Sequence, residues 1–242
     1  MNINISNYPP FSNDHKHVEL TLLSDQGFSN ENYTFQANNT RYLLRKFILQ
    51  DRDRELEYEI QSLAYQKNIA AKPVILDLEC NLMICEFIEG EHKSMLSKED
   101  VLSIAEVLKK LHYIKIDKES MVLKNLFTTQ TQKVREAFNV IEKYPKEMHL
   151  CHNDLNPKNL LFSNHGVKCI DWEYAGINDR YFDLAAVSVE FLLDEDIEAH
   201  FLDSYFETTP YFKAKLEAYK TIYIALCKEW FEALEVTQPS QI

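Results

Sequence analysis

The sequence predicts an α+β protein in which a β-rich part, residues 1–88, precedes a larger and mostly helical part, residues 89–242. Three observations support this organisation. Residues 18–49 form apolar runs of β type that are separated by turn residues. Apolar residues recur at helical spacing over residues 53–68 and again after Ser97. The chain has only 4 glycines, where average usage would give roughly 17, and each falls in a predicted loop.

Within the β-rich part, the pattern predicts strands over residues 18–23, 32–37, 41–47, 74–78 and 81–88. Asn38 and Asn39 mark a turn between the second and third of these strands. One helix is expected over residues 53–68, with its apolar positions on one face. Residues Phe87–Glu91 then connect the two parts of the chain.

The second part is expected to begin with a helix that Ser97 caps, with Asp100 as its capping-box partner three residues later. A further helix is predicted over about residues 129–143, and residues 180–236 are predicted to be helical and rich in aromatic side chains. Between them, two short strands over residues 159–162 and 167–171 flank a turn that contains Gly166.

Composition narrows the classes of function. The formal net charge is −12, which argues against a nucleic-acid partner, since such a protein needs a basic surface. The N-terminal residues lack the basic and apolar regions of a signal peptide, and no apolar run is long enough to span a bilayer. The 5 cysteines are scattered without a C-x-x-C pair, which indicates a reducing compartment. We therefore expect a cytoplasmic protein without a membrane partner.

Three polar residues near the middle of the second part predict a phosphoryl-transfer site. Asp154 lies in a loop, Asn159 follows five residues later, and Asp171 ends the second predicted hairpin strand. Transfer of a phosphoryl group needs a carboxylate beside the attacking hydroxyl and hard oxygen ligands for Mg²⁺. We interpret Asp154 as the base, and Asn159 and Asp171 as the two metal ligands, the hairpin returning Asp171 to the same place.

The segments H-N-D-L-N-P-K-N at residues 152–159 and I-D-W-E-Y-A-G at residues 170–176, followed by F-D-L-A, carry a resemblance to a known family. They are similar to the choline/ethanolamine and thiamine kinases of the aminoglycoside-phosphotransferase-like group. This resemblance implies a two-lobed, protein-kinase-like fold. Residues 1–88 would be the nucleotide-binding lobe, a small antiparallel sheet with one main helix. Residues 89–242 would be the helical lobe with the catalytic loop and the acceptor site.

The same resemblance implies which residues bind ATP. Gly27, Ser29 and Asn30 match the family's loop over the phosphates, and Arg45 matches its phosphate-binding basic residue on a central strand. The helical partner of Arg45 would be Glu57 or Glu59. Both lie beside the apolar stripe of the predicted helix, so the sequence does not choose between them, and Glu57 is taken as the first choice. The segment around Glu86 and Ile88 resembles the hinge, whose backbone binds the adenine.

The acceptor is expected to be a small cationic alcohol, which aromatic faces and carboxylates hold. The candidate side chains are Glu173, Tyr174, Asp183, Glu190, Tyr223 and Trp230. By resemblance, Tyr174 and Glu190 match positions of a choline site, whereas Glu91–Ser94 resembles a segment of bacterial thiamine kinases. The first choice is therefore choline or ethanolamine, followed by thiamine and then an aminoglycoside. A catalytically silent nucleotide-binding relative is the remaining alternative, and the oligomeric state cannot be read from the sequence.

Overall fold

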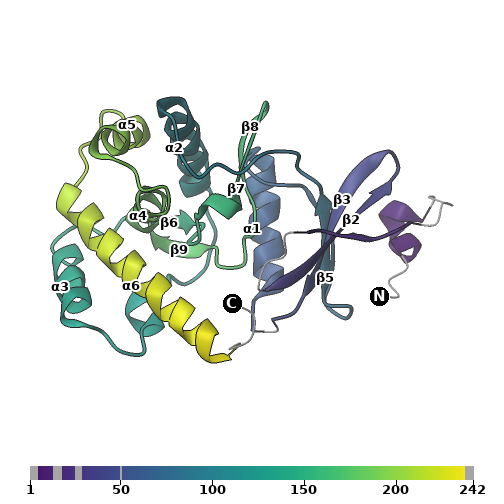
Figure 1. Cartoon of the computed structure of the whole chain (residues 1–242), viewed down its shortest axis with the longest axis horizontal. Coiled ribbons are helices and arrows are strands. Elements are labelled where there is room, and N and C mark those ends of the chain that lie inside the picture. The colour runs from purple at the N-terminus through teal and green to yellow at the C-terminus, as the bar shows by residue number, and fades with distance from the viewer. Residues whose placement is uncertain (1–4, 13–17, 25–28, 50, 238–242) are drawn as a thin grey trace. The chain divides into compact units, whose positions relative to one another are not determined.

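The computed structural model describes residues 5–12, 18–24, 29–49 and 51–237, and the chain divides into two compact units (Figure 1). The first unit contains the chain up to Glu91 together with Lys168–Glu173, and the second contains residues 92–167 and 174 onward. The chain therefore returns to the first unit for a short stretch, and this stretch includes Asp171.

A five-stranded antiparallel sheet in the order β1-β2-β3-β5-β4 forms the centre of the first unit. Its strands are β1 Thr21–Leu22, β2 Asn30–Ala37, β3 Thr40–Phe47, β4 Pro73–Asp77 and β5 Leu82–Glu86. Strands β2 and β3 pair along their whole length. The predicted turn between them is confirmed, because Asn38 and Asn39 have φ angles of 50° and 60°, as a two-residue hairpin turn requires.

The first predicted strand is much shorter than expected. Residues 18–23 were predicted to form a strand, but only Thr21 and Leu22 pair with β2. Val18 and Leu20 instead pack against the apolar cluster that includes Phe11. Packing in that cluster, rather than strand pairing, therefore places this part of the chain.

Opposite faces of the sheet are covered by different parts of the first unit. Leu44 of β3 packs with Ile5 and Phe11, from two short 3-10 turns at Ile5–Asn7 and Pro9–Phe11. The next residue, Arg45, binds Glu57 of helix α1 (Arg54–Gln66). Because successive strand side chains point to opposite faces, α1 and the 3-10 turns lie on opposite sides of β3.

Helices dominate the second unit. They are α2 Lys98–Tyr113, α3 Gln132–Ile141, α4 Tyr181–Glu190, α5 Glu195–Phe206 and α6 Lys213–Thr237. The predicted capping box at the start of α2 is confirmed: the Ser97 hydroxyl accepts from the Asp100 amide at 3.2 Å, and the Asp100 carboxylate accepts from the Ser97 amide at 3.0 Å.

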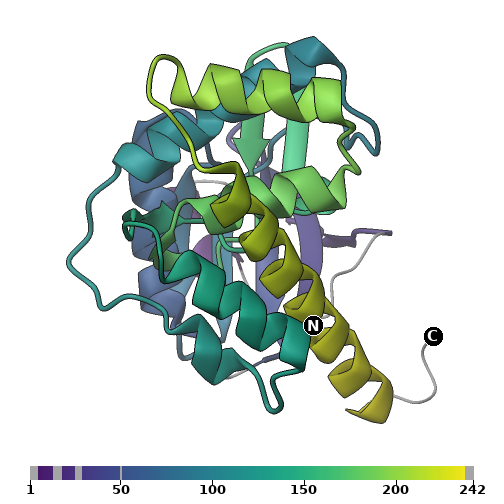
Figure 2. The ribbon, with the colours of Figure 1, turned by 90° about the vertical axis from the view of Figure 1, so that its left-hand side faces the viewer.

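Helix α4 is the core of the second unit. Its residues Tyr181–Ser188 are all buried, and apart from Asp183 and Ser188 they are apolar or aromatic. Helix α6 contacts α4 and α3, and Figure 2 shows α3 and α6 side by side. Although α6 has 25 residues, no helix in the described part of the chain is both long and apolar enough to cross a membrane.

Two small two-stranded sheets follow, and within strand β8 the chain passes from the second unit into the first. Strand β6 (Met148–Cys151) pairs antiparallel with β9 (Gly176–Asp179), and β7 (Leu160–Ser163) pairs with β8 (Gly166–Cys169). The β7–β8 hairpin was predicted, but its second strand was expected to reach Asp171. It ends at Cys169, and Asp171 has a φ angle of 64°, a left-handed conformation that cannot continue a pleated strand.

Candidate active site

The loop after β6 presents the Asp154 carboxylate in a defined orientation. Its two oxygens accept hydrogen bonds from side-chain amides, one from Asn159 at 2.7 Å and one from Asn156 at 3.0 Å. The Asn159 amide nitrogen also donates to the Asp154 carbonyl at 2.9 Å. Both asparagines belong to the 3-10 turn that follows, since Asn156 caps Pro157–Asn159. A half-buried carboxylate with its rotamer held by two donors suits a group that orients a hydroxyl and accepts its proton.

Asn153 anchors this loop in an uncommon conformation. Its φ angle is 66°, in the left-handed region that asparagine tolerates better than most residues. Its side-chain nitrogen donates to the Tyr174 carbonyl at 2.9 Å, and its side-chain oxygen accepts from Asn178 at 2.9 Å. These bonds tie the loop to the chain around β9.

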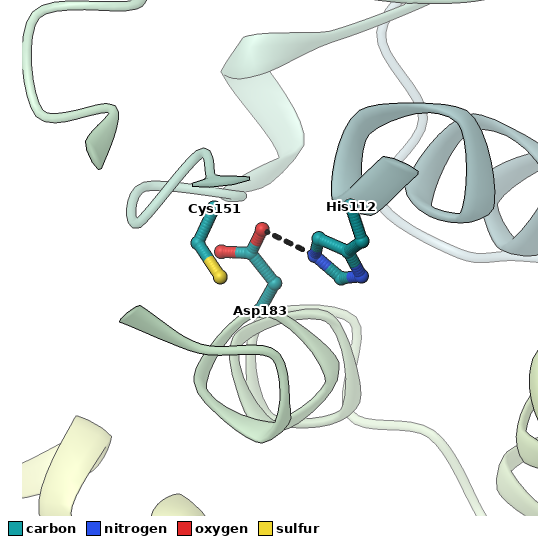
Figure 3. A group of neighbouring side chains, drawn as sticks. All are labelled: His112, Cys151 and Asp183. Carbon is teal, nitrogen blue, oxygen red and sulfur yellow. Dashed lines mark hydrogen bonds and ion pairs between the residues drawn. The ribbon is translucent and has the colours of Figure 1, made fainter. Parts of the chain in front are cut away.

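Asp183 of α4 binds the backbone of the same loop. Its carboxylate accepts from the backbone amides of His152 at 2.8 Å and Asn153 at 2.9 Å, and it pairs with the His112 ring at 3.2 Å. Figure 3 shows His112 and Cys151 on either side of it. His112 also bonds the Tyr205 hydroxyl at 2.6 Å.

This environment corrects one expectation from the sequence. Asp183 was predicted to line the acceptor site, but its exposed fraction is 0%. Its carboxylate accepts hydrogen bonds from two backbone amides of the loop. His112, Cys151 and Asp183 lie close enough together to be metal ligands by residue type. The His112 and Asp183 ligand atoms form hydrogen bonds with each other, with Tyr205 and with the backbone of His152 and Asn153, so in this structure these two residues belong to a hydrogen-bond network next to the loop that carries Asp154.

In the first unit, Arg45 joins α1 to the segment after β8. Its guanidinium donates to Glu57 at 2.5 Å and to Asp171 at 2.5 Å. Glu57 is therefore the helical partner of Arg45, and the alternative, Glu59, is exposed. Burial alone would lower the pKa of Arg45, but the charges of Glu57 and Asp171 outweigh it and raise the pKa, so this side chain stays cationic.

Arg54, the first residue of α1, makes a parallel set of contacts. It donates to Glu57 at 2.6 Å and to Glu173 at 3.1 Å, and Glu173 accepts from the Ser29 hydroxyl at 2.7 Å. The Glu173 side chain is only 3% exposed. Burial and the charge of Asp171 raise its pKa, against the opposing effects of Ser29, Arg54 and Arg45. Glu173 was predicted to bind the acceptor. In the structure its carboxylate instead accepts hydrogen bonds from Ser29 and Arg54.

The predicted phosphate loop is described only in part. Gly27 lies outside the described residues, whereas Ser29 and Asn30 are buried. With its amide oriented to satisfy both neighbours, Asn30 donates to the Ser29 carbonyl at 3.0 Å and accepts from Arg45 at 2.8 Å. Ser29 and Asn30 thus reach Glu173 and Arg45, respectively.

Of the two predicted hinge residues, Glu86 ends β5 and Ile88 lies two residues beyond it. The Glu86 amide donates to the Lys72 carbonyl and the Phe87 amide to the Arg41 carbonyl, both at 2.9 Å. For Ile88, by contrast, no hydrogen bond of the backbone amide is formed with any described residue. A backbone amide without a partner among the described residues suits recognition of a planar base edge.

The remaining acceptor candidates lie in the second unit. The Tyr223 hydroxyl donates to Glu190 at 2.9 Å, and Tyr223 itself is buried. Cys227 lies one turn further along α6. Burial raises the pKa of its thiol to about 11, and the negative charges of Glu190 and Asp154 contribute to this increase. Trp230 is 39% exposed. Tyr174 is half-buried, and its carbonyl binds Asn153.

Several residues that contact the predicted site residues of their own unit were not predicted from the sequence: Arg54 in the first unit, and His112, Asn156 and Cys227 in the second. Arg54 had a usable signal, because it lies three residues before Glu57 on a predicted helix, and such pairs are neighbours. Cys227 also had one, because it shares a helical face with Tyr223. His112 and Asn156 carry no comparable pattern.

A sequence profile of the phosphotransferase enzyme family matches residues 20–211. The chain belongs to this family and is a small-molecule kinase. It is 24% identical over 250 residues to the protein LicA of Haemophilus influenzae, covering 90% of this chain and 73% of that protein. Over a short stretch of 49 residues it is 47% identical to a thiamine kinase of Shigella boydii, covering 20% of this chain and 18% of that enzyme.

Solved structures agree with this assignment. The chain resembles the choline kinase LicA from Streptococcus pneumoniae with a TM-score of 0.76 and 25% identity, covering 92% of this chain and 88% of that one. A structure of LicA in complex with AMP gives a TM-score of 0.67 and 26% identity, with coverage of 88% and 85%. The fold is therefore that of the kinase-like phosphotransferases, and the family is one that binds nucleotides.

Proposed function

We propose that this protein transfers the γ-phosphoryl group of ATP to the hydroxyl of a small cationic alcohol, with choline or ethanolamine as the first choice. The observation that carries the proposal is the Asp154 carboxylate, which Asn159 and Asn156 orient at 2.7 and 3.0 Å. The likeness to a choline kinase over most of the chain supports the choice of acceptor.

In the proposed reaction, Asp154 accepts the proton of the acceptor hydroxyl as its oxygen forms a bond to the γ-phosphorus. The bond between the γ-phosphorus and the β–γ bridging oxygen breaks, and ADP leaves with that oxygen. Positioning and charge stabilisation supply most of the catalysis in such transfers. The bonds from Asp183 to the backbone of His152 and Asn153 hold the loop that carries the base.

Asn159 and Asp171 are the residues that would hold Mg²⁺. The amide nitrogen of Asn159 is bound to Asp154, so its oxygen is the end of the amide that remains for a metal. Asp171 gives one carboxylate oxygen to Arg45, and its side chain is 36% exposed. These oxygens match the preference of Mg²⁺ for hard ligands. When bound, the ion would neutralise negative charge on the phosphates.

The first unit supplies the groups proposed for the nucleotide. Arg45 is a permanently cationic side chain for the phosphates. Ser29 precedes β2 and contacts Glu173, and Asn30 begins β2 and contacts Arg45. The Ile88 amide and the backbone at Glu86 would bind the adenine edge. For the acceptor cation, Glu190 and the exposed Trp230 supply a carboxylate and an aromatic face.

A thiamine kinase is the second candidate. The observation in its favour is the short match to a thiamine kinase, which reaches 47% identity over 49 residues. The two candidates share Asp154, Asn159 and Asp171, so they differ only in the acceptor.

The test is ADP production with choline, ethanolamine, thiamine and kanamycin, each against a reaction without acceptor. We expect turnover with choline or ethanolamine. Turnover with thiamine alone would keep the chemistry but replace the acceptor, and nucleotide binding without any turnover would favour a silent relative. A neutral choline analogue, with carbon in place of the nitrogen, tests recognition of the cation. If this analogue is phosphorylated as well as choline, the proposed recognition of the cation is wrong.

A further inference from the structure

The ion pairs of the first unit close into a ring. Glu57 accepts from Arg45 through one oxygen and from Arg54 through the other. Arg45 continues to Asp171 and Arg54 to Glu173, and the backbone through Trp172 joins these two acidic residues. The ring therefore connects β3, α1 and the segment that carries Asp171.

We propose that Arg54 and Glu173 are positioning residues for the nucleotide, because they hold Asp171 and the loop at Ser29 in place. The proposal rests on the function proposed above, which uses Asp171 and Ser29 but assigns no role to Arg54. It also gives Glu173 a role on the nucleotide side of the reaction, in place of the role in acceptor binding that the sequence predicted.

The buried Arg54 side chain connects Glu57 of α1 to Glu173. It is 6% exposed, and its guanidinium lies over the Phe47 ring at 4.2 Å. Besides the two carboxylates, it donates to the Leu49 carbonyl at 3.3 Å. A buried, stacked guanidinium with several acceptors has one accessible geometry, and a lysine ammonium cannot reproduce its planar fork.

The segment that Arg54 holds needs an external constraint. Asp171 has a φ angle of 64°, in the left-handed region that aspartate enters more readily than most residues but less readily than glycine. Its carboxylate is held on one side by Arg45. On the other side the chain is held two residues later, where Glu173 binds both Arg54 and Ser29. Loss of Arg54 would remove the salt bridge to Glu173 and leave the Ser29 hydroxyl as its remaining side-chain partner in this set, so the segment after Asp171 would be held less firmly.

The experiment compares Arg54→Met, Arg54→Lys, Glu173→Gln and the double variant Arg54→Met/Glu173→Gln with the wild type. The matched control is Arg52→Met, which removes a guanidinium two residues away that pairs with the exposed Asp51. Affinity for Mg·ATP is measured by calorimetry, KM is measured for ATP and for the acceptor, and thermal unfolding reports the folded state.

We expect Arg54→Met to raise KM for ATP about tenfold, which corresponds to ~1.4 kcal/mol, with KM for the acceptor within about twofold of the wild type. Arg54→Lys should recover only part of this loss. The double variant should be no worse than the more affected single variant, because both remove the same link. Arg52→Met should behave as the wild type.

A folded Arg54→Met variant with an unchanged KM for ATP would overturn the proposal, as would equal changes in both KM values. If Arg54→Met does not fold, Glu173→Gln decides, since it breaks the same link from the other end. A wild type that binds Mg·ATP without turnover would refute the proposed function alone, and the role of Arg54 would then be read from the binding affinities. A wild type that binds no Mg·ATP would refute both.

Discussion

Replacing Asp154 by asparagine separates the chemical role of this residue from its structural role. Asparagine has nearly the same shape but cannot accept a proton from the acceptor hydroxyl. Its single carbonyl oxygen can also accept from only one of the two amide donors, so we expect the bond to Asn159 to remain and the bond to Asn156 to be lost. ATP binding should not change, because the proposed nucleotide groups are other residues.

The two consequences differ in size. Loss of one hydrogen bond at a half-exposed group costs about 1 kcal/mol of folding free energy, a shift of roughly 2–4 °C in Tm for a chain of this length. Loss of the base should lower kcat by roughly 10²–10⁴-fold, which is ~2.7–5.4 kcal/mol in activation free energy. The variant should therefore be folded and nearly inactive.

The assay is steady-state ADP release with the best acceptor, together with calorimetry of Mg·ATP and a thermal melt. The control is Asp117→Asn, the same substitution at an exposed aspartate in the loop after α2. A value of kcat within about threefold of the wild type would refute the assignment of Asp154 as the base, since general-base catalysis is worth at least roughly a hundredfold.

Three further predictions concern the other parts of the site. Asp171→Ala should remove the Mg²⁺ dependence of nucleotide affinity, and unchanged Mg·ATP binding in calorimetry would show that it is not a metal ligand. Arg45→Ala should raise KM for ATP more than KM for the acceptor, with Lys46→Ala as the control, and equal effects on the two would move phosphate binding elsewhere. Trp230→Ala and Tyr174→Ala should each raise KM for the acceptor by roughly ten- to thirtyfold, as expected for loss of one cation–π contact, with ATP affinity unchanged. A normal KM for the acceptor in either variant would exclude that aromatic residue from the acceptor site.

Local patterns in the sequence predicted the α+β organisation, most elements and the family. The Asn38–Asn39 turn and the Ser97–Asp100 capping box were predicted correctly, because a turn or a cap depends on residues that are close in sequence. The sequence limited the helical partner of Arg45 to Glu57 or Glu59, and the structure decided for Glu57. The first strand was predicted too long, because its apolar residues Val18 and Leu20 pack in a cluster rather than in the sheet.

Only the tertiary structure decided what each carboxylate does. Asp183 and Glu173 are acidic residues close to the motif, and the sequence alone made both of them candidates for the acceptor. In the structure Asp183 binds backbone amides 31 and 30 residues away. Glu173 binds Arg54 at a separation of 119 residues and Ser29 at 144. Periodicity and turn chemistry act between near neighbours in sequence, such as Arg54 and Glu57. The partner of a buried charge in a distant segment is chosen by packing, so only the fold shows that Arg54 binds Glu173.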